Sequence, residues 1–200
     1  MKTTILTIAL LTATILGTSN STFASTGKTE TATTTTTLTN VSNISEIEIR
    51  GNVELYVSAG TADQVKVYNN YYSNNALVQD DKGVLRIASY STQKLTVWVT
   101  ANQLAKLSVY DNATVKSFGK LSAINLDVEL YNNASAQLNM DAFSANVKVN
   151  DNAKANLTGD VIEGSLKTNN TANLNTKDLK VSHLAKAIEV KSEEVELALL

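Results

Sequence analysis

Four copies of a short Asn-rich phrase recur in the second half of the chain, and their first residues lie 21, 19 and 19 positions apart. A period near twenty, with turn-forming residues at one fixed phase, is typical of a solenoid in which each repeat is one coil stacked on the next. The repeat therefore predicts a parallel β-solenoid, with coils over about residues 104–182. The copies are Tyr110–Ala113 (YDNA), Tyr131–Ala134 (YNNA), Asn150–Ala153 (NDNA) and Asn169–Ala172 (NNTA).

When the coils are aligned by this phrase, apolar residues occupy alternate positions, as in strands with one buried face. We expect one inward column at Leu107, Val128, Val147 and Leu166, and another at Ala113, Ala134, Ala153 and Ala172. An outer turn ladder is also predicted, because Asn and Asp tolerate left-handed backbone conformations and bond nearby amides through their side chains. The ladder consists of Asp111, Asn112, Asn132, Asn133, Asp151, Asn152 and Asn170.

Residues 44–100 alternate apolar and polar residues but lack the phrase. Ile47 and Ile49 alternate with charged residues, and the pattern returns at Leu95, Val97 and Val99. Such runs are strands, and the short breaks between them predict antiparallel hairpins. Residues 44–200 are thus expected to form one all-β domain, a parallel β-helix or β-solenoid with antiparallel hairpins in its N-terminal part. Residues 183–200 suit a strand or a helix, and we expect them to cap the last coil, because an open end promotes association.

Residues 1–24 have the order of a secretory signal peptide, with Lys2, an apolar run over 5–16 and a polar stretch that ends at Ala24. The apolar run is shorter than the roughly 20 residues that span a bilayer, and an uncleaved anchor is the alternative. The chain has no cysteine, so a packed core must stabilise it. Residues 25–43 are Thr-rich, which predicts a flexible spacer. We expect export to the periplasm or the cell surface.

The stretch Ile47–Leu55 (IEIRGNVEL), followed by further strands and then by turns at a period near twenty, resembles one bacterial family. This is the family of the "putative auto-transporter adhesin, head GIN domain", and the resemblance covers roughly 44–182. It implies a right-handed parallel β-helix-like fold and no established enzymatic activity. Family members often have Gly-Ser-Gly type triplets where this chain has Asp-Asn-Ala or Asn-Asn-Ala, and Asn also accepts the left-handed conformation.

Motifs for catalysis or metal binding are sparse. His183 is the single histidine, no Gly-x-Ser-x-Gly elbow accompanies it, and zinc needs three or four ligands. Calcium could use the Asp-containing turns, but the glycine-rich nonapeptide repeat of calcium-loaded β-rolls is missing. A net charge of −2 without a basic stripe argues against nucleic acid. We expect no enzyme and no cofactor. A polysaccharide-active site would need convergent carboxylates, for which the candidates are Asp127, Glu129, Asp141 and Asp160.

Tyrosines give the better indication of a binding surface. Five of the seven precede the first phrase, and Tyr71 and Tyr72 are adjacent in an Asn-rich segment, while Tyr110 and Tyr131 lie one coil apart. Exposed tyrosine beside asparagine combines flat apolar area with hydrogen-bonding groups, which suits glycan or protein surfaces. The alternative is that the rings only cover strands and turns. The hypothesis is an exported, non-enzymatic, adhesin-like module that contacts glycan or protein at the cell envelope. The alternatives are a scaffold in an envelope complex and a polysaccharide-active β-helix enzyme.

Overall fold

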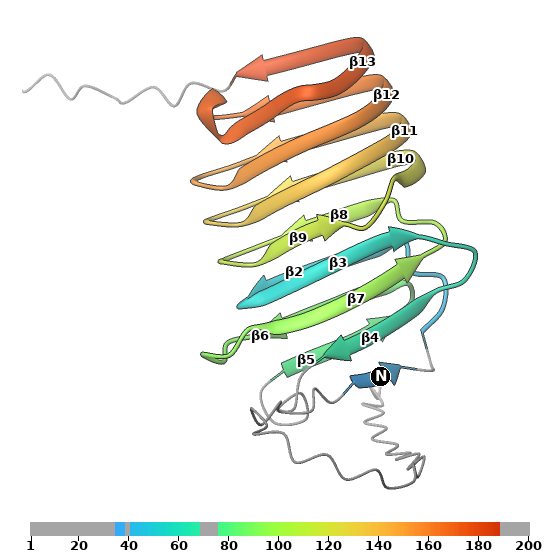
Figure 1. Ribbon diagram of the computed structural model, residues 1–200. Coiled ribbons are helices and arrows are strands. Elements are labelled where there is room, and N and C mark those ends of the chain that lie inside the picture. Colours follow the sequence, from blue (N-terminus) through green and yellow to red (C-terminus); the bar gives the residue numbers. More distant parts are fainter. Residues whose placement is uncertain (1–34, 39–40, 69–75, 189–200) are drawn as a thin grey trace, which may run out of the picture. The chain divides into compact units, whose positions relative to one another are not determined.

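The structure is a computed structural model that describes residues 35–38, 41–68 and 76–188, all within one compact unit. These ranges consist mostly of strands, with a 3-10 turn η1 at Thr171–Asn173 (Figure 1). They contain no helix of the length and apolarity that crossing a membrane requires. The strands are β1 (Thr35–Leu38), β2 (Glu46–Gly51), β3 (Val53–Ala59), β4 (Gln64–Tyr68), β5 (Ala76–Asp81), β6 (Val84–Ser89), β7 (Leu95–Ala101), β8 (Lys106–Val109), β9 (Thr114–Ser117), β10 (Leu121–Leu130), β11 (Ser135–Val149), β12 (Lys154–Thr168) and β13 (Leu174–Ile188).

The strands form two rows around one core, and we call two consecutive strands joined by a turn a coil. The first row holds the strands that precede the turns, namely β6, β2, β8, β10 and the second halves of β11, β12 and β13. The second row holds the strands that follow the turns, namely β7, β3, β9 and the first halves of β11, β12 and β13. We call the side with the turns the turn edge. The opposite side, where the three longest strands pass from one row to the other, is the bend edge.

Neighbouring coils pair in parallel at a constant register. Val128 is partnered by Leu107 of β8 and by Val147 of β11, and Val147 is partnered in turn by Leu166 of β12. All four side chains are at most 3% exposed and belong to one apolar core cluster. Because strand side chains alternate between the two faces, every second residue enters this core. The column is the one that the aligned phrases predict.

Parallel coils begin earlier in the chain than the predicted range of 104–182. β2 and β3 pair in parallel with β8 and β9 on one side and with β6 and β7 on the other. β2 passes into β3 through Gly51 and Asn52, and Gly51 has a φ of 78°, in the region that favours glycine. A shorter turn thus takes the place of the Asn-rich phrase, which is why the repeat is not visible there.

Antiparallel pairs lie beside these first coils. β5 and β6 form a hairpin closed by Lys82 and Gly83, whose φ values are 54° and 83°. β4 pairs antiparallel with β7, and β1 pairs antiparallel with β4. The fold is therefore all-β, as predicted, and its pairing is a mixture of parallel and antiparallel.

Two predicted boundaries differ from the structure. Thr35–Leu38, inside the predicted spacer 25–43, form β1 and pair with β4, because threonine favours strands and Leu38 packs against the core. Residues 183–188, which the sequence predicts to belong to the cap, are the end of β13 and pair with β12 as part of the last coil. The signal peptide 1–24 with Ala24, the rest of the spacer up to residue 34, and residues 189–200 lie outside the described residues.

Candidate functional site

The Asn-rich turns of neighbouring coils are bonded to one another along the turn edge. Asp111, Asn132 and Asp151 have φ values of 61°, 60° and 55°, in the left-handed region that Asn and Asp tolerate. The amide of Asn132 donates to Asp151 Oδ2 at 2.9 Å, and the amide of Asp111 donates to Asn132 Oδ1 at 3.3 Å. The main-chain amides of Asn133 and Asn152 donate to the carbonyls of Asp111 and Asn132. These side chains therefore hold coil to coil.

Two further members of the ladder lie at its margins. Asn133 Nδ2 donates to Asn112 Oδ1 at 3.4 Å, between exposed side chains. Asn170 lies in the fourth turn, which leads into η1, and its carbonyl accepts a hydrogen bond from Thr168 Oγ1 at 2.9 Å. The fourth turn thus departs from the geometry of the first three.

Tyr110 and Tyr131 form a stack on the outer face of the first row, next to the turn edge. Their ring centroids lie 4.9 Å apart with an interplanar angle of 4°. The guanidinium of Arg50 lies 3.9 Å from the centroid of the Tyr110 ring. Because β2 and β10 flank β8 on opposite sides, Arg50 and Tyr131 cover opposite faces of Tyr110. The ring of Tyr110 therefore offers a ligand its edge and not its flat face. Tyr71 and Tyr72 lie outside the described residues.

Below this stack, Glu129 joins side chains from three coils. Lys148 Nζ donates to Glu129 Oε1 at 2.9 Å, Lys106 Nζ lies 3.9 Å from Oε2, and the Tyr131 hydroxyl donates to Oε2 at 3.4 Å. The hydrogen bond from Lys148 lowers the pKa of Glu129 below its ordinary value, and the charge of Lys106 adds to this. Burial raises the pKa of Tyr131. Glu129 is thus held ionised and paired with cations, which is a structural role and does not poise it for proton transfer near neutral pH.

An aromatic cluster that sequence reasoning missed lies on the outer face of the second row. Trp98 stacks on Tyr56 at 4.7 Å, meets the edge of Tyr68 at 6.4 Å, and lies 5.4 Å from Phe118. Phe118 is 64% exposed, whereas the other three rings are half-buried. Tyr56 and Trp98 are register partners on β3 and β7. Since these strands are 42 positions apart in the sequence, no local pattern could have indicated the contact.

The bend edge carries a second surface that sequence reasoning missed. Ile124, Phe143 and Ile162 are 77%, 50% and 46% exposed. The residues immediately before and after each of these positions are register partners of their counterparts on the neighbouring coil. The three side chains therefore occupy equivalent positions on three successive coils. We call this column the apolar ridge. Lys120 flanks it, with Nζ 3.3 Å from Asp160 Oδ2 and 4.0 Å from Asp141 Oδ2. The spacing of 19 residues between ridge positions, equal to that of the later phrases, was the signal that could have found it.

The family model described as "Putative auto-transporter adhesin, head GIN domain" matches residues 43–193. The chain belongs to this family. The resemblance stated from the sequence is thereby confirmed, and no protein with a curated description matches the chain.

Solved structures resemble this GIN domain in fold. A "putative adhesin" from Parabacteroides distasonis is 14% identical with a TM-score of 0.59, and the match covers 78% of this chain and 77% of that one. A "putative lipid binding protein" from the same organism is 9% identical with a TM-score of 0.59 and 78% of each chain covered. A "putative adhesin" from Parabacteroides merdae is 13% identical with a TM-score of 0.57, covering 78% and 77%. At such identities the likeness shows a shared fold alone.

The candidate carboxylates of the GIN domain fall into two separate groups. Asp127 and Glu129 lie on β10 in the first row, whereas Asp141 and Asp160 are register partners next to the bend edge and share Lys120. The four therefore do not converge on one site. Across the described ranges, no three His, Cys, Asp or Glu side chains are grouped so that they could hold a metal ion.

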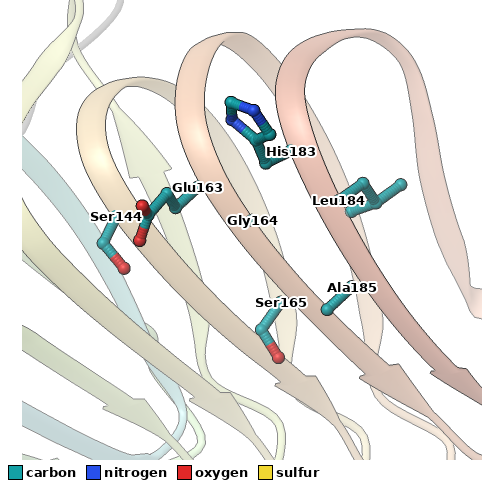
Figure 2. A pocket seen from close by; sticks show the side chains of 7 residues that line it. All are labelled: Ser144, Glu163, Gly164, Ser165, His183, Leu184 and Ala185. Carbon is teal, nitrogen blue, oxygen red and sulfur yellow. The ribbon is translucent and has the colours of Figure 1, made fainter.

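His183 lies in a shallow depression across the last three coils, beside the ridge (Figure 2). Ser144, Glu163 and His183 occupy one register row on β11, β12 and β13. A Ser-His-acid relay needs the histidine between the other two, but here the glutamate is in the middle. The main chain at His183 is two strand spacings, about 9.6 Å, from that at Ser144, measured across the strands. The row is therefore not a nucleophile relay. The residues lining the depression are Ser144, Glu163, Gly164, Ser165, His183, Leu184 and Ala185.

Proposed function

We propose that this GIN domain is an exported, non-enzymatic, adhesin-like module that contacts a protein at the cell envelope through the apolar ridge. The observation that supports this most is the stack of Ile124, Phe143 and Ile162, which are 77%, 50% and 46% exposed on successive coils. Single exposed apolar residues are ordinary on protein surfaces, whereas contiguous ones mark interaction sites. Ile and Phe carry no hydrogen-bonding groups, so the ridge suits apolar side chains of a protein better than the hydroxyls of a glycan.

The surroundings of the ridge also favour a protein partner. Lys120 with Asp141 and Asp160 gives it a charged border, and protein interfaces commonly combine an apolar centre with a polar rim. We further propose that the coils form a parallel β-solenoid. Its successive turns would present ridge residues at intervals of about 4.8 Å, the distance between neighbouring strands.

Export is part of the same proposal. The order of residues 1–24 is that of a signal peptide with cleavage after Ala24, and the family description names an adhesin. A protein partner would accordingly belong to the envelope or lie outside the cell. A scaffold role in an envelope complex would use the same surface and differ only in the permanence of the contact.

Photo-crosslinking in the native host tests the ridge directly. A photoreactive phenylalanine analogue at position 143 should give a discrete crosslinked protein. The same analogue at Tyr90, which is 74% exposed, serves as the matched control and should not. Ile124→Lys with Ile162→Lys should abolish the product at position 143 while the melting temperature stays within a few degrees, because both side chains are largely outside the core. Equal products at positions 143 and 90, or a product insensitive to the lysines, would refute the proposal.

Glycan binding is the second candidate, favoured by the cluster around Trp98. Phe118 at its margin is 64% exposed and offers an aromatic surface, and the predicted binding residues Tyr71 and Tyr72 follow Tyr68 closely in the chain. Trp98 is the only tryptophan, so its fluorescence reports on this surface alone. A saturable change with a glycan that Phe118→Ala removes would favour this candidate. Titration with lipid vesicles, followed by the same fluorescence, tests lipid as a further class of ligand, because one structural neighbour is described as lipid binding.

A further inference from the structure

The last coil leaves inward-facing apolar side chains uncovered. Leu184 of β13 is 51% exposed, although Ala145 and Leu126, two and three coils earlier in the same register column, are 2% and 1% exposed. Its direct partner, Gly164, is buried. A Cβ on Gly164 would lie 3.4 Å from Leu184 Cδ1, so Leu184 packs directly over this glycine. Leu184 is exposed because no described coil lies beyond it, and its position faces the core.

Two neighbouring columns end in the same way. Leu179 and Val181 are only half-buried, whereas Val161, the partner of Val181, is 3% exposed. Among the described strands, β13 pairs only with β12, so the amides and carbonyls of its other side have no partner strand. An apolar end with an open main-chain edge is a template for association unless something covers it.

We propose that residues 189–200 (EVKSEEVELALL) cover this end as an intramolecular cap. The segment follows Ile188, the last residue of β13, without a break. Its 12 residues reach up to about 40 Å when extended, which is enough to return across the first half of β13. Val195, Leu197 and Leu199 alternate with Glu194, Glu196 and Ala198, so an extended segment would direct three apolar side chains to one face.

Charge favours this occupant. The segment contains four glutamates and one lysine, a net charge of −3. The strand β13 contains Lys177, Asp178, Lys180 and Lys186, a net charge of +2. The cap and the coil therefore attract each other.

A second copy of the chain is the rival occupant, and it is disfavoured on two grounds. Two β13 edges would bring together two strands that each carry a net positive charge, and the association of two chains would cost translational freedom. The attached segment is instead present at an effective concentration in the millimolar range.

Hydrogen exchange of the mature chain tests the cap. Deletion of 189–200 should speed exchange of the amides of Leu179–Leu184 about tenfold or more. In the intact chain, opening of β13 would have to uncover apolar side chains that pack against the cap, so removing the cap lowers the free energy of this local opening. The double variant Leu197→Ser with Leu199→Ser should act in the same direction while keeping the length and charge. Amides of Leu107–Val109 in β8 are the internal control, and deletion of 25–34 is the control for chain shortening. A synthetic peptide of residues 189–200, added to the deletion variant, should slow the exchange again.

The oligomeric state separates the two occupants. The deletion variant should form a concentration-dependent dimer by light scattering, whereas the intact chain should not. Exchange in β13 that is the same in the intact chain, the deletion variant and the double variant would overturn the proposal. If the intact chain forms a dimer and its β13 amides lose their protection from exchange on dilution, the second copy is the occupant and the proposal is overturned. If the deletion variant does not fold, the double variant still gives the decisive comparison.

Discussion

Replacing Gly159 with alanine should destabilise the protein more than the same change at Gly119. Both glycines have positive φ values, 104° and 80°. A Cβ at position 159 would lie 2.0 Å from the Met140 carbonyl oxygen and 2.9 Å from its amide nitrogen, whereas nothing lies within 4 Å of a Cβ at position 119. Gly159 and Met140 are register partners on β12 and β11. The clash is therefore between the new Cβ on β12 and the main chain of β11, and relieving it would separate these hydrogen-bonded strands.

The expected loss in the free energy of unfolding contains two contributions that both variants share and one that only Gly159→Ala has. At either site alanine costs about 1–2 kcal/mol in a left-handed conformation, and it recovers about 0.4–1 kcal/mol by restricting the unfolded chain. Gly119→Ala should thus lower the free energy of unfolding by about 1 kcal/mol. Gly159→Ala adds the cost of overpacking, about 1–3 kcal/mol. The backbone and chain-entropy terms cancel in the comparison, so the difference between the two variants isolates the contact.

Urea unfolding of the mature chain, followed by far-ultraviolet circular dichroism, measures both variants. Exchange of the Met140 amide should also become faster in Gly159→Ala than in Gly119→Ala, because the strain is local to that pair of strands. Equal losses of stability at the two sites would refute the argument. A larger loss at Gly119 would do so more strongly, because that site offers no steric contact at all.

Three further predictions concern the turn ladder, the charged pair and export. Asn132→Ala should cost about 1–2 kcal/mol, because alanine tolerates the left-handed conformation poorly, while Asn133→Ala should stay within about 0.5 kcal/mol; thermal unfolding in the opposite order would contradict this. The lowered pKa of Glu129 means that its charge stabilises the fold above the ordinary glutamate pKa of about 4.3 and ceases to do so as pH falls through the lowered value. The stability lost in Glu129→Gln, measured by urea unfolding, should therefore shrink between pH 7 and pH 3, and a constant loss would argue against it. Mass spectrometry of the exported protein should find Ser25 as the first residue, and a chain that retains Met1 would exclude cleavage.

The second half of the fold could be predicted because its coils follow one another in the sequence. Leu107, Val128 and Val147 are partners in successive coils, so aligning the phrases also aligned the core. The positive φ values of Asp111, Asn132 and Asp151 likewise fall at the second residue of each of the first three phrases. Here local turn chemistry and the long-range contacts have the same period.

The first half could not be predicted in this way, because its coils stack out of sequence order. β2 lies between β8 and β6, although β6 and β8 both come later in the chain. No repeat search at a fixed period detects such an arrangement. The contact between Tyr56 and Trp98 depends on the same interleaving, so the sequence alone does not reveal the aromatic cluster.

The turn edge and the bend edge differ in how strongly the fold constrains the residues that could contact a ligand. On the turn edge, Asn132 must hold a left-handed conformation while its amide and carbonyl bond to neighbouring coils. A substitution there changes stability before it changes binding. On the bend edge, Ile124 and Phe143 project into solvent by half or more of their surface, so their identity is not dictated by the core. A binding surface can therefore vary at the ridge while the ladder keeps the coils in register, and this is the physical reason to look for the partner at the bend edge.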